Sequence, residues 1–127
     1  MKKYFALPLI ALTIFTTACN ENQPIIDSSN IAISADTQKR YNVDKIGNII
    51  AETAAHRGWS VNKTGAGVIK ANVKRKELQV AIIIHYSKSS YSITPDTSVQ
   101  SDTRLYNRYV AGLRKDVDKR LSMAAYQ

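Results

Sequence analysis

The chain has 127 residues and a formal net charge of +8, from 18 Lys and Arg against 10 Asp and Glu. This length permits a single domain, and a single cysteine excludes an internal disulfide, so a hydrophobic core has to hold the fold together. The two histidines restrict the choice of general base or metal ligand.

The first 18 residues are organised like a secretion signal. Lys2 and Lys3 supply a positive start, residues 4–15 form an apolar run, and residues 16–18 are small. The apolar run is shorter than the roughly 20 residues that a membrane-spanning helix requires, and no later segment approaches that length. We expect residues 1–18 to be removed. Without Lys2 and Lys3, the rest of the chain keeps 16 of the 18 basic side chains against all 10 acidic ones, a net charge of +6.

Cys19 directly follows these small residues and resembles the lipobox cysteine of bacterial lipoproteins. The resemblance implies that lipid attached at Cys19 anchors the chain to a membrane, which takes more than one acyl chain to be firm. In enterobacterial lipoproteins Asp after the cysteine favours the inner membrane, so Asn20 implies the outer membrane, with the domain facing the periplasm. The lipobox favours Leu where this chain has Thr16, and ordinary signal cleavage that leaves a free thiol is the alternative.

Residues 20–41 are rich in Asn, Ser, Asp, Gln and Thr and show no sustained apolar period. We interpret residues 19–41 as a lipidated flexible tether with a root-mean-square span of roughly 25 Å. Ile31 and Ile33 allow a short edge strand as the alternative. The folded domain is then expected over residues 42–127.

Apolar residues at helical spacing predict a helix over residues 43–57. Asn42 is its expected N-cap and Gly58 its expected end. Gly47 inside this helix costs about 1 kcal/mol relative to alanine, so it either weakens the helix or marks close packing against a neighbouring element.

Alternation of apolar and polar residues then predicts four strands, the first from Trp59 to the turn at residues 64–67 and the others over 68–74, 78–86 and 91–94. A two-residue turn at 75–76 places Ile69 opposite Ile82, with the apolar residues of both strands on one face. A loop at 87–90 pairs Tyr86 with Tyr91 on that same face. Since Arg and Lys are unusual in such a turn, a longer or bulged loop is the alternative.

A second helix is predicted over residues 102–124 from a continuous apolar stripe. Its opposite side carries Arg104, Arg108, Lys115 and Lys119. One arrangement buries both helix stripes: a two-layer α+β fold in which an N-terminal and a C-terminal helix pack on one face of a four-stranded antiparallel meander.

Four segments of this domain are Gly58-Trp59, residues 80–86, residues 91–93 and residues 106–110. Together they resemble a group of small, largely uncharacterised proteobacterial lipoproteins, over about residues 43–121. The chain departs from the group at Tyr109, where Trp is frequent, and at residues 98–99, where an Asn-Leu pair is frequent. The resemblance implies a fold and an envelope location, and the group has no established activity to transfer.

Candidate catalytic groups are few. His56 ends the first helix, where a positive imidazole interacts favourably with the helix dipole. His85 lies opposite Ser92 on the sheet face away from the helices, so a small hydrolase or isomerase using this pair is the catalytic alternative, although no glycine elbow or oxyanion donor accompanies it. No metal-ligand spacing or phosphate-binding loop stands in the sequence. We therefore expect a noncatalytic protein without metal or cofactor.

Two surfaces are candidates for binding. The outer sheet face is expected to present Val68, Lys70, Lys74, Ala81, Ile83 and His85, together with Asn72 and Gln79. An exposed apolar patch rimmed by polar groups can mark a partner site, and a wet antiparallel face is its ordinary alternative.

The second surface is the basic stripe of Arg104, Arg108, Lys115 and Lys119, with the hairpin tip at residues 74–76. Such a stripe suits anionic headgroups or acidic partners, although most basic stripes are simply solvated. A periplasmic location disfavours nucleic acid. The sequence therefore predicts a noncatalytic envelope module that binds a protein, a glycan or an anionic lipid headgroup.

Overall fold

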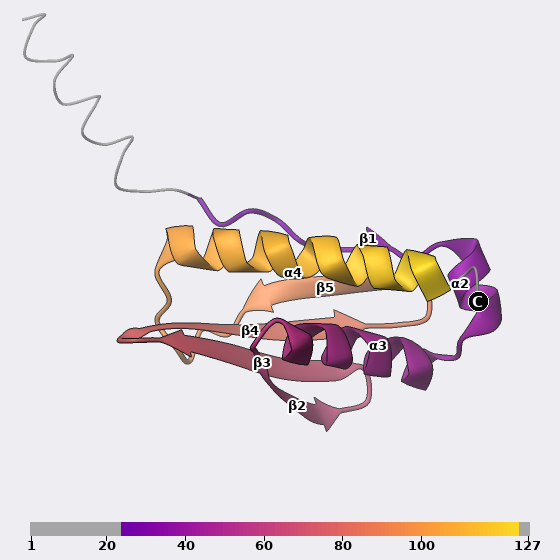
Figure 1. The fold of residues 1–127 in the computed structure, drawn as a ribbon, viewed down its shortest axis with the longest axis horizontal. Helices are drawn as coiled ribbons and strands as arrows, with labels where there is room; N and C mark the ends of the chain where they lie inside the picture. The colour runs from indigo at the N-terminus through magenta and orange to yellow at the C-terminus, as the bar shows by residue number, and fades with distance from the viewer. Residues whose placement is uncertain (1–23, 125–127) are drawn as a thin grey trace, which may run out of the picture.

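The computed structural model describes residues 24–124 of the chain. The signal segment and Cys19 lie outside the described residues. Along the chain the elements are β1 (Ile31–Ala32), α2 (Ala35–Arg40), α3 (Val43–His56), β2 (Ser60–Gly65), β3 (Val68–Arg75), β4 (Leu78–Tyr86), β5 (Ser90–Pro95) and α4 (Thr103–Ala124). The domain is α+β, as predicted, with a five-stranded antiparallel sheet in the order β1-β5-β4-β3-β2 (Figure 1).

The core lies between the helices and one face of the sheet. The long helices α3 and α4 lie side by side and both contact the sheet. Alternate residues of the central strands, among them Ile69, Ile82 and Ile84, are fully buried against Ile50 of α3 and Leu113 of α4. The period-two pattern of the strands and the helical period of the stripes therefore meet in one hydrophobic core.

The helix ends follow the capping residues that the sequence shows. The Asn42 side chain accepts a hydrogen bond from Lys45 N at 2.9 Å at the start of α3. Gly58 follows that helix with φ of +93°, a conformation that glycine adopts without strain. Asp102 Oδ1 accepts from Leu105 N at 3.0 Å at the start of α4. Both predicted helices are confirmed within two residues at each end.

The register of the β3–β4 hairpin differs from the predicted one by two residues. Arg75 pairs with Leu78, and Ile69 lies opposite Ile84 instead of Ile82. The turn is formed by Lys76 and Glu77, with Lys76 at φ of +56°. A shift by two residues leaves every side chain on its predicted face of the sheet. The predicted pairing is therefore wrong, but the assignment of residues to the core face and the outer face is right. The predicted pairing of Tyr86 with Tyr91 is confirmed.

The prediction of four strands is one strand short, because part of the expected tether is folded. β1 pairs with β5, Ile31 opposite Tyr91. Ser28 O accepts from Ile93 N at 2.9 Å, and Ile33 is 4% exposed. Thr37 of α2 is fully buried and donates to Leu121 O of α4 at 2.8 Å. Residues 24–33, here called the N-terminal strap, thus lie on the domain, and the edge-strand alternative is the one that holds.

Candidate functional site

The outer face of the sheet, opposite the helices, carries a groove of about 270 Å³ over β2, β3 and β4. The register explains its lining, because Ser60 pairs with Asn72, Asn62 with Lys70, and Lys74 with Gln79. Side chains at these positions point to the face that does not meet the core. We name as the outer groove the residues Ser60, Val61, Asn62, Lys70, Ala71, Asn72, Gln79, Ala81, Asp96 and Val99.

One wall of the outer groove is the loop over residues 96–101. Asp96 N donates to Ala81 O at 3.0 Å, and Ser101 Oγ accepts from Ala81 N at 3.4 Å. This loop covers Ala81, which is 4% exposed. The expectation that Ala81 belongs to an exposed apolar patch is therefore wrong, because strand alternation alone does not reveal a loop that crosses the face.

The outer groove holds one group of each charge beside neutral polar groups and four apolar residues. Hydrogen bonds from the side chain and backbone of Ser98 hold the pKa of Asp96 below its usual range, and the nearby Lys70 acts in the same direction. Asn62, Asn72 and Gln79 each offer an amide that both donates and accepts. Such a lining suits a polar ligand with several hydroxyl groups.

The remaining outer-face candidates lie around the groove. Val68 and Ile83 are half-buried, and Lys74 and His85 are exposed. Within the β4–β5 pair His85 lies opposite Ser92, as predicted. Ser92 Oγ accepts from Asn30 N of the strap at 2.9 Å. Within residues 24–124 no hydrogen bond joins His85 to Ser92, whose Oγ is bonded to the strap instead.

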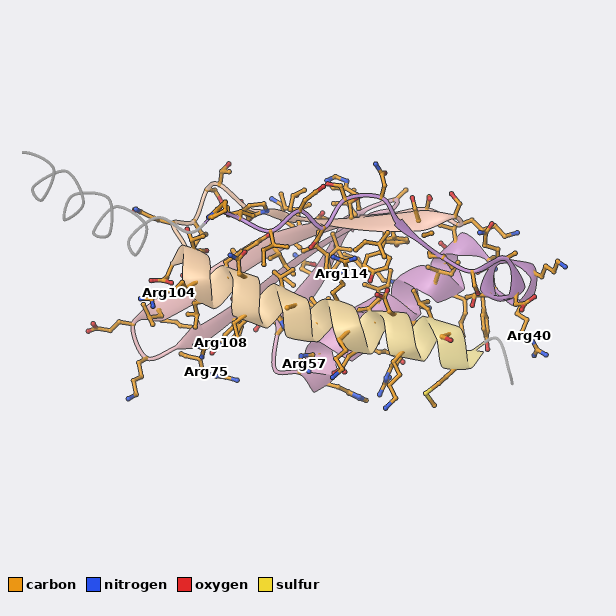
Figure 2. All side chains as sticks on the ribbon, turned by 90° about the horizontal axis from the view of Figure 1, so that it is seen from above. Arg40, Arg57, Arg75, Arg104, Arg108 and Arg114 are labelled. Carbon is orange, nitrogen blue, oxygen red and sulfur yellow. The ribbon has the colours of Figure 1, made fainter. Side chains whose placement is uncertain are left out.

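The four cations of the predicted basic stripe, Arg104, Arg108, Lys115 and Lys119, are exposed on α4. Figure 2 shows Arg104 and Arg108 along the first half of this helix, with Arg75 at the same end of the molecule. Arg57 at the end of α3 instead reaches across to α4, where its Nη1 donates to Asp116 Oδ2 at 2.7 Å.

Two aromatic residues from the segments that resemble the lipoprotein group meet in space. The rings of Trp59 and Tyr109 are 6.4 Å apart and nearly perpendicular, at 74°. Arg57 and Arg75 flank them in a recess of about 140 Å³. The edge-to-face contact fixes the start of β2 against α4.

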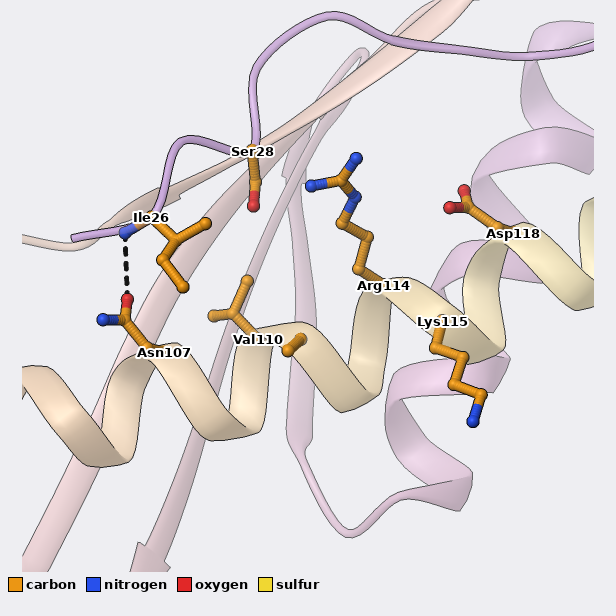
Figure 3. Close-up of a pocket in the computed structure, with 8 residues that line it drawn as sticks. Ile26, Ser28, Asn107, Val110, Arg114, Lys115 and Asp118 are labelled. Carbon is orange, nitrogen blue, oxygen red and sulfur yellow. Dashed lines mark hydrogen bonds between the residues drawn. The ribbon is translucent and has the colours of Figure 1, made fainter.

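The sequence does not predict the cavity of about 280 Å³ between the strap and α4 (Figure 3). Arg114 points from α4 toward the strap beside Ser28 and Asp118. Tyr91, buried beneath, donates to Asp118 Oδ1 at 2.5 Å. No sequence signal marks this cavity, since it exists only because the strap folds back onto the helix.

Residues 24–124 hold no group of three or more His, Cys, Asp or Glu placed to bind a metal ion. In the same range no helix combines the length and apolarity needed to cross a bilayer. No protein-family model, curated protein or solved structure matches the chain. The resemblance to proteobacterial lipoproteins therefore stays a prediction.

Proposed function

We propose that the chain is a membrane-anchored periplasmic lipoprotein, lipidated at Cys19 and held at the outer membrane, whose domain is a noncatalytic binding module. The domain is a two-layer α+β structure that uses its helices to build the core and leaves the outer sheet face for a ligand. The ligand that best suits the outer groove is a hydroxyl-bearing polar molecule, such as a segment of an envelope glycan.

The outer groove is the observation that carries this proposal. Its polar side chains come from three adjacent strands and a loop, so a rigid sheet sets their spacing. Asn62 and Asn72 are exposed, so a ligand can replace their bound water with little rearrangement. Lys70 and Asp96 add one site for an acidic group and one for a basic or hydroxyl group.

Two measurements test the anchor. The intact mass of the chain from bacterial membranes should show lipid on Cys19, and a Cys19→Ala variant should leave the membrane fraction or keep an uncleaved signal. An unmodified mass with unchanged membrane attachment would overturn the lipid assignment.

The groove is tested by titrating soluble glycan fragments of the bacterial envelope into the purified chain. A triple variant, Asn62→Ala with Asn72→Ala and Gln79→Ala, should weaken binding at least tenfold, because each lost hydrogen bond contributes about 1 kcal/mol. The matched control carries Lys39→Ala with Glu52→Ala, two exposed residues of α2 and α3. Equal affinity of the triple variant and the control would remove the groove from the proposal.

A further inference from the structure

The N-terminal strap begins beside two exposed arginines. Asn107 Nδ2 donates to Pro24 O at 3.0 Å, and Asn107 Oδ1 accepts from Ile26 N at 3.0 Å. Arg108 follows Asn107 in α4, and Arg104 lies about one helical turn before it. The structure therefore fixes Pro24 against α4 at the level of this arginine pair.

The connection from Pro24 back to Cys19 is short. Cys19 precedes Pro24 by five positions. Five residues span at most about 18 Å even when fully extended. The tether of roughly 20 residues that the composition suggests would let the domain move well away from the membrane. The five-residue connection between Cys19 and Pro24 does not. With lipid on Cys19, the end of the domain that carries Pro24 stays close to the bilayer.

That end of the domain is basic. The turn between β3 and β4 lies at the same end as the start of α4 (Figures 1 and 2). It brings Lys74, Arg75 and Lys76 to the end that carries Arg104 and Arg108, and we call these five residues the basic end. Glu77 of the turn and Asp102, which caps α4, lie next to these five residues in the chain, and Asp27 of the strap follows Ile26. Five positive charges therefore stand against three negative ones, a net charge of +2.

We propose that the basic end is a membrane-contact surface, which lies on the anionic lipid headgroups of the membrane that holds Cys19. The inference rests on the proposed anchor. Each Lys or Arg near an anionic leaflet raises the affinity of a protein for that leaflet about fivefold. A few cations are therefore enough to select one orientation for a domain that a lipid anchor already holds at the membrane. Lys115 and Lys119, further along α4, lie outside this surface, which divides the basic stripe into a membrane half and a solvated half.

This orientation has a consequence for the outer groove. β4 begins at the basic end and finishes at Tyr86, so the strands run away from the membrane. Both faces of the sheet then rise from the bilayer, and the outer groove stays open to a ligand in the periplasm.

The test measures the depth of two positions at opposite ends of β4. The full chain is produced with its signal, extracted from membranes, and carries either Lys76→Cys or Lys88→Cys labelled with an environment-sensitive fluorophore. Lys88 is exposed in the loop after β4, which makes it the matched control. Intact mass first establishes that Cys19 carries lipid and that the label sits at the introduced cysteine.

The labelled chains are reconstituted into vesicles of brominated phosphatidylcholine with added phosphatidylglycerol. The fluorophore at position 76 should be quenched several-fold more than the fluorophore at position 88. This difference should shrink in the double variant Arg104→Glu with Arg108→Glu. It should persist in the control double variant Lys119→Glu with Lys39→Glu. Equal quenching at both positions, with lipid present on Cys19, would overturn the membrane-contact surface and leave the anchor intact.

A chain whose mass shows no lipid on Cys19 refutes the anchor by itself. The basic end is then tested on the mature chain by co-sedimentation with phosphatidylglycerol vesicles and, as a reference, phosphatidylcholine vesicles. Preferential binding of about tenfold or more, lost in the Arg104→Glu and Arg108→Glu variant, supports the surface. Equal sedimentation refutes it. Folding should survive the variant because both side chains are exposed, and Glu at position 104, in the first turn of α4, interacts favourably with the helix dipole.

Discussion

The ring of Tyr86 lies directly across Gly47, so that a Cβ built on Gly47 would stand 2.5 Å from both Cζ and Oη of the tyrosine. Tyr86 ends β4, and Gly47 is a buried residue of α3. The contact therefore lets the helix approach the sheet at a point where any side chain would keep them apart. Of the two explanations that the sequence allows for this glycine, close packing is confirmed.

Replacing Gly47 with alanine should destabilise the domain, although alanine is the better helix former by about 1 kcal/mol. The new methyl group overlaps the Tyr86 ring, and overpacking of this kind typically costs about 1–3 kcal/mol. Urea unfolding should show a net loss of roughly 1 kcal/mol. In a Tyr86→Ala background the same Gly47→Ala substitution should instead stabilise the protein. If Gly47→Ala changed the free energy of unfolding in the same direction with Tyr86 present and with Tyr86→Ala, the contact would be contradicted.

Gly112 of α4 makes the matched comparison, because its close neighbour is the guanidinium of Arg57. This side chain is exposed and flexible at its far end, and its ion pair with Asp116 is 39% and 40% exposed. Exposed pairs contribute about 0–1 kcal/mol, so the gain in helix propensity should offset any loss. Gly112→Ala should leave the free energy of unfolding unchanged or raise it by a few tenths of a kcal/mol. A loss above about 1 kcal/mol would show that Arg57 cannot move aside.

The two long helices could be predicted because local residues determine their ends. Asn42 and Gly58 bracket α3, and Asp102 caps α4, each through contacts with near neighbours in the chain. The register of the β3–β4 hairpin could not be predicted, because Lys76 takes a positive φ in its turn. Gly and Asn are the residues that signal such a turn in a sequence. The faces of the strands were still right, since side-chain direction depends only on parity.

The sequence could not predict the strap or the wall of the outer groove. The strap depends on Asn107, more than 80 positions away from its partners at residues 24 and 26, with separations of 83 and 81. Polar composition at residues 20–41 looks like a tether whether or not a distant helix binds it. Asn72, Lys70 and Gln79 could be placed on the outer face by alternation. The position of Asn62 in the groove follows only from the pairing of β2 with β3. The burial of Ala81 follows only from the path of the loop over residues 96–101.

Removing the amide of Asn107 should release the start of the strap without unfolding the domain. Asn107→Ala deletes both hydrogen bonds to the strap, at a cost of about 1–2 kcal/mol to the closed strap. Amide exchange at Ile26 should accelerate. Exchange at Ile33, whose N–H donates to Ser89 O at 2.9 Å, should stay slow. Unchanged exchange at Ile26 would mean that Asn107 does not hold the strap.

The hydroxyl of Tyr106 should be dispensable for stability. It is the buried side-chain polar atom without a hydrogen-bond partner among the described residues, and Tyr106 is 1% exposed. A buried hydroxyl without a partner costs about 1–3 kcal/mol of desolvation, so Tyr106→Phe should raise the free energy of unfolding or leave it unchanged. Thermal and urea unfolding report this directly. A loss of more than about 1 kcal/mol would reveal a partner for this hydroxyl.

Tyr91 should make the domain lose stability in alkaline solution. Burial, the 2.5 Å hydrogen bond to Asp118 and the charge of that carboxylate raise the pKa of Tyr91 above its ordinary value, against an opposing effect of Arg114. The folded chain thus keeps a proton that the unfolded chain releases near pH 10. Stability from this group is complete below about pH 10 and falls as the pH rises further.

Burial also raises the pKa of Tyr106, to about 12, so this second tyrosine adds to the same slope. The free energy of unfolding should be measured by urea titration between about pH 8 and pH 11, for the wild type, Tyr91→Phe and the double variant with Tyr106→Phe. The slope above pH 10 should be reduced in Tyr91→Phe and reduced further in the double variant. Identical slopes in all three proteins would show that the buried tyrosines do not limit alkaline stability.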